Sequence, residues 1–225
     1  MSNKAILFDF GGTLNSDGDH WGVLFRERLW DEFPERSIEE LEEAYIESER
    51  RLVREGLREE TFRETLRLQI RYQFEVLGEG RIERANKHAD EFYAITVERM
   101  SEVRTLLKDL SPRYRLGIVS NFYGNLDAIC NEFQLTPYLA LILDSALAGV
   151  RKPDPEIWQR AITQVGFTPG ETVIVGDSWK NDIAPGIGLG CKTVWYRGLE
   201  WRPAHEDQRA DHQIRSLAEL RELLL

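Results

Sequence analysis

The stretch Ala5-Ile6-Leu7-Phe8-Asp9-Phe10-Gly11-Gly12-Thr13 joins four apolar residues to an acidic turn that contains two glycines. A short, unbroken apolar run of this kind is typical of a strand that is buried on both faces of a sheet. Asp9 then stands where the strand meets solvent, and Thr13 brings a hydroxyl group to the same turn. We therefore expect residues 5–8 to form a buried strand with a carboxylate at its end.

Short apolar runs alternate with helical segments from Tyr114 onward. Strands are expected at 116–119, 141–143 and 172–175, and helices at 126–133 and 155–165. This alternation predicts a parallel sheet with helices on both faces, and residues 5–8 should join that sheet because they have no partner strand nearby. The expected fold class is α/β, with a Rossmann-like, three-layer α/β/α core.

The stretch from His20 to about Met100 follows a different pattern. Its apolar residues recur at helical spacing, and Ser37 with Glu40 forms a capping box that predicts a helix start. Four helices fit this stretch, so we interpret it as an inserted helical bundle. The expected domains are a discontinuous core, residues 1–17 and 102–225, and a helical cap, residues 18–101.

Charge and composition restrict the partners. The chain has 225 residues and a formal net charge of -10, which argues against nucleic acid or an anionic membrane surface as the main partner. No window reaches the roughly 18 apolar residues that a membrane span requires, and no leader segment is evident, so we expect a cytoplasmic protein. Cys130 and Cys191 show no metal-ligand spacing and are interpreted as buried, reduced thiols. The oligomeric state stays open.

Polar residues follow each of three predicted strands. Asp9 follows the first, Ser120 and Asn121 follow the second, and Asp177 with Ser178 follow the strand at 172–175. Ligands of open parallel sheets bind beyond the carboxyl ends of the strands. If these strands are neighbours, the site has carboxylates for a hard divalent cation and a place for an anionic substrate. Taken singly, each residue is explained equally well as a turn or cap residue.

Lys152 precedes a predicted helix in a stiff segment. Asp154 is a good N-cap and Pro155 suits the first helical position, so the start of the helix is fixed and Lys152 is held just before it. A lysine in such a segment can be aimed at a site. The alternative is a solvated loop lysine.

In this order, the four segments resemble the motifs of the haloacid dehalogenase superfamily. The matching residues are Asp9 to Thr13, Ser120, Lys152, and Gly176-Asp177-Ser178 with Asp182 following. The resemblance covers the whole chain, because the helical insertion looks like the helical cap of that family and residues 210–220 look like its closing strand and helix. It implies a phosphatase that acts on a small phosphorylated metabolite.

The resemblance also implies roles for individual residues. Asp9 would be the nucleophile that attacks phosphorus, while Ser120 and Lys152 would assist catalysis by holding the phosphoryl oxygens. Mg²⁺ would be the cofactor. Its implied ligands are Asp9, the backbone carbonyl of Gly11, Asp177 and Asp182, and the implied substrate-binding residues are Gly12, Thr13, Ser120, Asn121 and Lys152.

Gly11 departs from the family pattern, in which a second Asp stands two residues after the first. That Asp protonates the departing oxygen and later activates water, and loss of a positioned acid or base costs about 10²- to 10⁴-fold in rate. We expect either a bias toward substrates with good leaving groups or a replacement acid. Asp17, His20 and Glu27 are the candidates, and His20 is expected either to titrate near neutrality or to be a loop residue without function.

Three rival functions remain open. Dehalogenases of the family also lack the second Asp, but Asp177 argues against that chemistry because a carboxylate there would repel a haloacid unless a cation neutralised it. Phosphonate-cleaving relatives need a cap lysine, and Lys87 is the only lysine within the predicted cap. The third rival is a binding or regulatory module that keeps the phosphate and metal pocket with little turnover.

Overall fold

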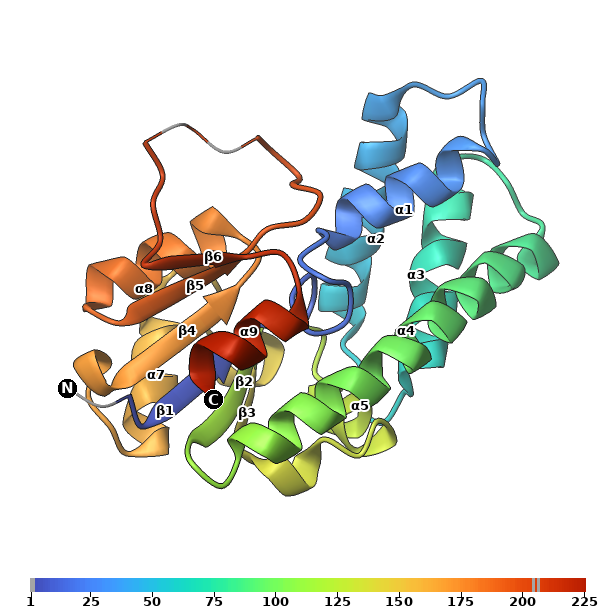
Figure 1. Ribbon diagram of the computed structural model, residues 1–225. Coiled ribbons are helices and arrows are strands. Elements are labelled where there is room, and N and C mark those ends of the chain that lie inside the picture. The colour runs from blue at the N-terminus through green and yellow to red at the C-terminus, as the bar shows by residue number, and fades with distance from the viewer. Residues whose placement is uncertain (1–2, 204, 206) are drawn as a thin grey trace.

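The computed structural model describes residues 3–203, 205 and 207–225, and its centre is a six-stranded, fully parallel sheet (Figure 1). The strands are β1 (Ala5–Phe8), β2 (Arg115–Ser120), β3 (Leu139–Asp144), β4 (Thr172–Gly176), β5 (Lys192–Tyr196) and β6 (His212–Ile214). They lie in the order β3-β2-β1-β4-β5-β6. The predicted α/β class is therefore confirmed, and the three strands with polar ends, β2, β1 and β4, are neighbours.

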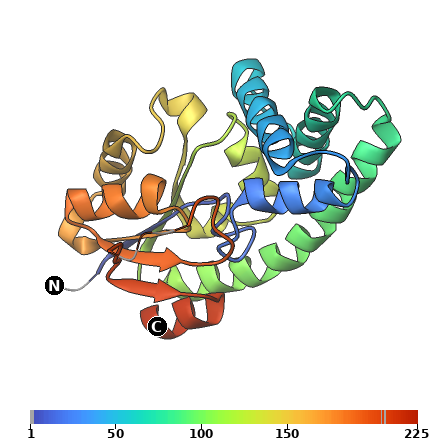
Figure 2. The ribbon, with the colours of Figure 1, turned by 90° about the horizontal axis from the view of Figure 1, so that it is seen from above.

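Alternate residues of β1 point to opposite faces of the sheet, so the strand is apolar throughout. Ile6 and Phe8 belong to one hydrophobic cluster, and Ala5 and Leu7 belong to a second one that includes Trp158. Both faces are covered, as Figure 2 shows from above. The helices of the core are α5 (Leu126–Glu132), α6 (Ser145–Ala148), α7 (Pro155–Val165), α8 (Ala184–Leu189) and α9 (Leu217–Leu224), together with a π-helical turn, Trp179–Ile183.

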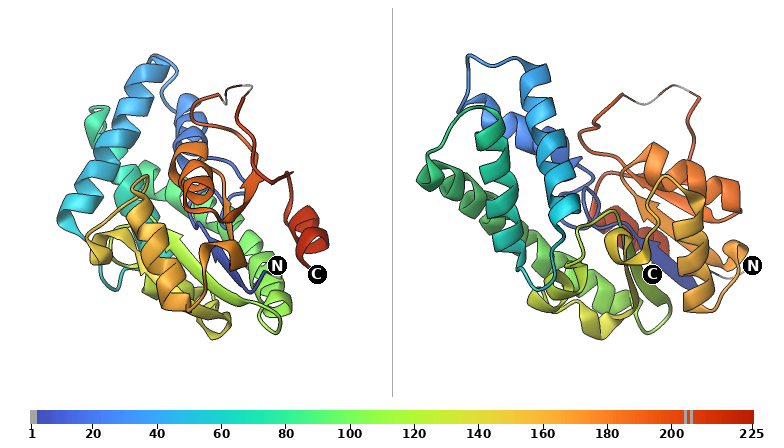
Figure 3. Two further views of the ribbon diagram at one scale, coloured as in Figure 1. Left: turned by 90° about the vertical axis from the view of Figure 1, so that its left-hand side faces the viewer. Right: turned by 180° about the vertical axis from the view of Figure 1, so that it is seen from behind.

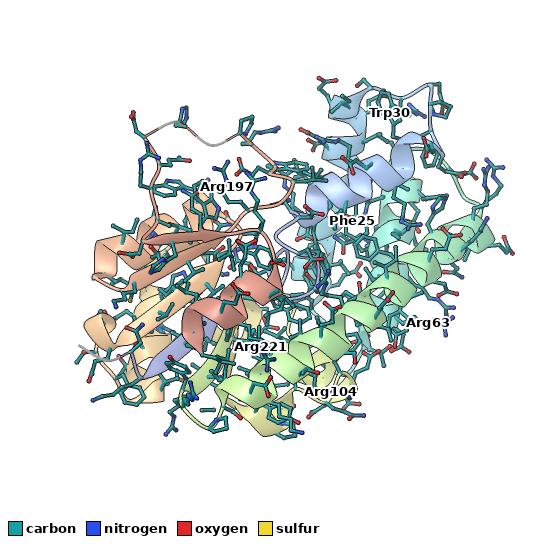
Figure 4. The ribbon with its side chains drawn as sticks, in the orientation of Figure 1. Phe25, Trp30, Arg63, Arg104, Arg197 and Arg221 are labelled. Atoms are coloured by element: carbon teal, nitrogen blue, oxygen red, sulfur yellow. The ribbon has the colours of Figure 1, made fainter. Side chains whose placement is uncertain are left out.

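Four helices fill the insertion, as predicted: α1 (Trp21–Trp30), α2 (Ile38–Glu55), α3 (Phe62–Val76) and α4 (Ile82–Leu110). The capping box of α2 is present, because Glu40 N donates to Ser37 Oγ and Ser37 N donates to Glu40 Oε2. The aromatic core of the bundle holds α1 on α4. Phe25 stacks on Phe92 at 5.0 Å between ring centroids, whereas Trp30 at the other end of α1 is exposed (Figure 4).

Helix α4 joins the two parts of the molecule. Its 29 residues run without a break from the helical bundle to the underside of the sheet (Figure 1). The predicted boundary at residues 101 and 102 falls inside this helix, so the cap and the core share it. None of the helices in the described part of the chain is both long and apolar enough to cross a bilayer. Cys130 and Cys191 are free and buried.

Candidate active site

Asp9 lies where β1 ends, at the centre of the sheet. Its backbone N–H continues the pairing with β4 by donating to Val175 O at 2.9 Å, and the residue is only 5% exposed. Ser120, at the end of the neighbouring strand β2, donates its hydroxyl to Asp9 Oδ1 at 3.2 Å. The ends of β1 and β2 therefore meet as the sequence predicts.

Thr13 ties the turn after β1 to the end of β4. Its hydroxyl oxygen lies 3.2 Å from Asp9 Oδ2 and 3.1 Å from Asp177 Oδ1, and it accepts the backbone N–H of Asp177 at 2.9 Å. The single hydroxyl hydrogen donates to one of the two carboxylates at a time. Asp177 is fixed further by Trp195, whose indole N–H donates to the Asp177 carbonyl at 2.8 Å. Thr13 is thus a structural bridge within the site.

Lys152 is buried between two carboxylates. Its Nζ lies 2.5 Å from Asp9 Oδ1 and 2.7 Å from Asp182 Oδ1, 4.9 Å from the ring centroid of Trp158, and the residue is 4% exposed. Burial favours the neutral amine, but Asp182 and Asp9 outweigh burial and raise the pKa of Lys152, so it stays charged. It is a site lysine and not a solvated loop lysine.

Asn121 positions Lys152. Its side-chain amide donates to the Lys152 carbonyl and accepts the Lys152 backbone N–H, both at 2.9 Å. Both polar atoms of the Asn121 amide group are therefore used by the protein itself. Asn121 lines the cavity, and its predicted contact with substrate stays a prediction.

The carboxylates of Asp9, Asp177 and Asp182 form the group of possible metal ligands. One oxygen from each lies within 4.8 Å of the others, and all three residues are buried. Burial, together with the neighbouring carboxylates, raises the pKa of Asp177 well above its usual range and that of Asp182 to about 6. Lys152 pairs with Asp9 and Asp182 and so brings one positive charge to three carboxyl groups. This donor set of hard oxygens with excess negative charge fits Mg²⁺.

The two glycines of the turn differ in the space that surrounds them. Gly11 lines the cavity above Asp9, and a Cβ placed on it would have no heavy atom within 4 Å. Gly12 has φ +98°, and a Cβ there would lie 2.6 Å from the Asp177 carboxylate. Its N–H donates to Asn15 Oδ1 at 3.0 Å. Gly12 and Thr13 are not among the described residues that line the cavity, so their predicted contact with substrate stays untested.

A cavity of about 430 Å³ lies over the carboxylates, between core and cap. Its core side carries Asp9, Ser120, Lys152, Asp177 and Asp182. Its cap side is formed mainly by α2, which lies next to the core in Figure 3. The α2 residues that line the cavity are Tyr45, Ile46, Glu49, Arg50 and Val53, and His20, Trp21, Phe122, Tyr123 and Arg151 complete the wall.

Two of the three predicted replacement acids do not reach this cavity. Asp17 has φ +58°, which turns its side chain toward α4, where it pairs with Arg99 and accepts from Tyr196 Oη at 2.6 Å. Asp17 and Glu27 both line a different cavity. Each was predicted from sequence proximity to Asp9, and the fold separates them from it.

His20 does line the active-site cavity, as the N-cap of α1. Its Nδ1 accepts the N–H of Gly22 at 3.0 Å, and its ring packs against Trp201 with centroids 5.3 Å apart. Burial lowers the pKa of His20 to about 4, with Asp9 opposing this shift and Arg202 adding to it. The lowered pKa does not fit the expectation that His20 titrates near neutrality. The alternative, a histidine without catalytic function, stays a prediction, and its N-cap bond gives it a structural role.

The sequence reasoning missed the polar residues on the cap side. Glu49 and Tyr45 are four residues apart and share one face of α2, next to the apolar stripe that predicts the helix. Tyr123 lies two residues after Asn121, just beyond the end of β2. Spacing within α2 would have placed Tyr45 and Glu49 together, but the direction of the helix relative to the core depends on tertiary packing.

Known proteins are similar to this chain in both sequence and structure. A family model described as haloacid dehalogenase-like hydrolase matches residues 3–190. The chain is 29% identical over 125 residues to glyceraldehyde 3-phosphate phosphatase of Pyrococcus furiosus, covering 54% of this chain and 52% of the relative. It is 36% identical over 92 residues to phosphoserine phosphatase of Thermus thermophilus, covering 40% and 35%. The chain thus spans about half or less of these relatives' own length.

Solved structures share the fold over the full length. A 2-haloacid dehalogenase from Pseudomonas syringae pv. Tomato DC3000 matches with a TM-score of 0.55 at 23% identity, covering 99% of this chain and 98% of that one. A HAD-hydrolase from Bacillus subtilis, solved with bound magnesium, matches with a TM-score of 0.61 at 22% identity, covering 100% and 99%. The extent of the family model, together with the residues assembled around Asp9, leads to one conclusion: this chain belongs to the haloacid dehalogenase-like hydrolase family.

Proposed function

We propose that this hydrolase is a Mg²⁺-dependent phosphatase that acts on a small phosphorylated metabolite through an aspartyl-phosphate intermediate. One observation carries the proposal: Asp9, Asp177 and Asp182 converge within 4.8 Å, beside the ammonium group of Lys152. A nucleophilic carboxylate, a set of hard metal ligands and a cation for phosphoryl oxygens then occupy one site. The phosphatase names of several relatives support the same reaction class.

In the first step, a carboxylate oxygen of Asp9 attacks phosphorus. The bond from phosphorus to the leaving oxygen breaks, and that oxygen keeps the electron pair and takes up a proton. Ser120 and Lys152 both contact Asp9 Oδ1, so they flank the place that the phosphoryl group enters. Water then attacks phosphorus, releasing inorganic phosphate and restoring the Asp9 carboxylate.

Mg²⁺ held by Asp9, Asp177, Asp182 and the Gly11 carbonyl would neutralise the negative charge that builds up around the phosphoryl group. The residues of the chain do the rest: they position the nucleophile, hold the phosphoryl oxygens and exclude bulk water. Gly11 leaves room for the group being transferred, because nothing lies within 4 Å of the place that a Cβ would occupy.

The rival dehalogenase chemistry fits this site less well. A haloacid brings its own carboxylate, which would approach three buried carboxylates, of which Lys152 pairs with two. Phosphonate cleavage needs a lysine of the cap at the active site, and Lys87 does not supply it. Lys87 has a side chain that is 75% exposed, lies 3.9 Å from Glu91, and is not among the described residues that line the active-site cavity.

The test is phosphate release with Mg²⁺ from acetyl phosphate, glucose 1-phosphate and glucose 6-phosphate, measured in parallel. We expect turnover that EDTA abolishes, that Mg²⁺ restores and that Asp9→Asn lacks. Asp9→Asn also excludes a contaminating phosphatase, because the variant is purified in the same way.

Activity that survives EDTA would contradict the metal-dependent phosphatase. No turnover of any of the three phosphates, in protein that still binds Mg²⁺ and inorganic phosphate, would favour the binding or regulatory module.

A further inference from the structure

In the first step of the proposed reaction the leaving oxygen takes up a proton. In the described part of the chain, the core side of the cavity has no acid placed to donate it, as the geometry of the step shows. In-line displacement puts the leaving oxygen on the side of phosphorus opposite the nucleophile. Asp9 lies on the core side, so the leaving oxygen faces the open cavity and its cap side. The position that the family fills with a carboxylic acid is Gly11, which has no side chain. Any acid in this chain must therefore come from the other residues of the cavity wall.

Among the described residues that line this cavity, Glu49 is the acidic one on the cap side. It lies on α2 and lines the same cavity as Asp9 and Gly11. Its Oε1 accepts two hydrogen bonds, one from the Tyr123 hydroxyl of the core and one from the Gln69 amide of α3. Among the described residues no hydrogen bond uses Oε2, which leaves this oxygen to carry a proton and to meet a ligand.

The surroundings of Glu49 keep that proton in place near neutrality. Burial raises its pKa to about 7, against the opposing effects of Tyr123, Gln69 and the positive charge of Arg151. A general acid works best when its pKa lies near the working pH, because it is then protonated and still able to give up the proton. Glu49 meets this condition.

The other groups around the cap side that could carry a proton do not have a pKa near the working pH. Tyr45 and Tyr123 have their pKa raised well above the usual value by burial and by the nearby charge of Glu49. His20 is neutral at pH 7, since burial lowers its pKa to about 4. Arg50 also lines the cavity, but it is paired with Glu43 and Glu47 and keeps its charge.

We infer that Glu49 donates the proton to the leaving oxygen of the substrate, in place of the carboxyl group that is missing at Gly11. As Asp9 forms its bond to phosphorus, the bond to the leaving oxygen breaks and Oε2–H of Glu49 protonates that oxygen. Water then hydrolyses the aspartyl-phosphate, and the Glu49 carboxylate takes up a proton from solvent. Glu49 is then neutral again, and the products are an alcohol and inorganic phosphate. The substrate class is a phosphate ester of a poor, alkoxide leaving group.

The experiment compares Glu49→Gln with the parent on two substrates, glucose 6-phosphate and acetyl phosphate. Gln keeps the size of the side chain and a carbonyl oxygen for Tyr123, but it has no acidic proton. We expect kcat for glucose 6-phosphate to fall by about 10²-fold or more, as for loss of a general acid, and kcat for acetyl phosphate to fall by at most about threefold. Equal losses on both substrates, or no loss, would overturn the inference.

A second experiment tests whether Gly11→Asp rescues Glu49→Gln. Introduced into Glu49→Gln, it should recover at least about tenfold of the lost glucose 6-phosphate turnover, since an acid again lies in the cavity. The matched control is Glu43→Gln, the same change on the same helix at a side chain that is 58% exposed, and we expect it to behave as the parent.

The parent protein gives a test that needs no variant. Its kcat for glucose 6-phosphate should decline above about pH 7, as Glu49 loses its proton, while kcat for acetyl phosphate should not. The same decline on both substrates would overturn the inference. The inference rests on the proposed phosphatase activity, and the two fail separately: a parent that does not hydrolyse acetyl phosphate with Mg²⁺ contradicts the function, whereas normal hydrolysis without the leaving-group effect contradicts only Glu49.

Discussion

Replacing each of the two adjacent glycines of the nucleophile turn by alanine should have opposite consequences. In Gly12→Ala, the new Cβ would lie 2.6 Å from three atoms of the Asp177 carboxyl group, at a backbone φ of +98°. In Gly11→Ala, the Cβ would meet nothing within 4 Å, at an ordinary φ. The two variants add the same methyl group one residue apart, so each controls for the other.

Two effects lower the free energy of unfolding of Gly12→Ala. An alanine at this φ costs about 1–3 kcal/mol of backbone strain. The overlap adds to it, because Asp177 cannot withdraw freely: Thr13 holds its N–H and Trp195 holds its carbonyl. We expect a total loss of about 3–5 kcal/mol in the free energy of unfolding, which is roughly 10 °C in Tm for a chain of this size. Gly11→Ala should change it by less than about 1 kcal/mol.

The assay is urea unfolding followed by circular dichroism, in EDTA and again with Mg²⁺. Gly12→Ala should also show a smaller rise in the free energy of unfolding on adding Mg²⁺, because its Asp177 carboxylate is displaced. Equal stability of the two variants would refute the reasoning, as would a normal Mg²⁺ response from a destabilised Gly12→Ala.

Three further predictions concern the buried charges. Lys152→Met should lose about 3–5 kcal/mol of stability in EDTA, since Asp9 and Asp182 lose their cation, and Mg²⁺ should stabilise this variant more than the parent in thermal unfolding. Asn121→Ala should lower kcat for acetyl phosphate and cost about 1–3 kcal/mol, because both of its hydrogen bonds to the Lys152 backbone disappear; unchanged kcat would contradict this positioning role. The folded protein favours protonated Glu49, so the stability that Glu49 contributes is complete below pH 4.5 and is lost as pH rises from 4.5 to about 7, by about 3 kcal/mol. Urea titrations at pH 5 and pH 8, in EDTA, check this: between these pH values the free energy of unfolding should decrease less in Glu49→Gln than in the parent.

The sequence predicts the core side of the site well because its geometry follows from local rules. A parallel strand that is buried on both faces reads as an apolar run, and the polar residue after it must lie at the carboxyl edge of the sheet. Asp9, Ser120 and Asp177 were placed in this way, and the adjacency of β2, β1 and β4 brings them together. The strand β5 was not predicted: its sequence, Lys-Thr-Val-Trp-Tyr, begins with two polar residues and has an apolar part of only three.

The cap side could not be predicted because it depends on how one helix docks on the core. The periodicity of α2 gives its buried face, but not which end of that face covers Asp9. The choice of replacement acids failed for the same reason. Asp17 is eight residues from Asp9 in sequence, yet its backbone turns it toward Arg99, whereas Glu49, forty residues away, lines the cavity.

The position of Glu49 also suggests why an acid on the cap suits this site. The core side already holds three buried carboxylates with one ammonium group, so a fourth carboxylate there would add repulsion. The pKa of Glu49 is raised chiefly by burial, and that burial depends on the cap, since Tyr123 of the core meets Glu49 of α2 across the cavity. Opening the cap would expose Glu49, lower its pKa and release its proton to solvent. The acid function of Glu49 would therefore depend on the contact between α2 and Tyr123 of the core.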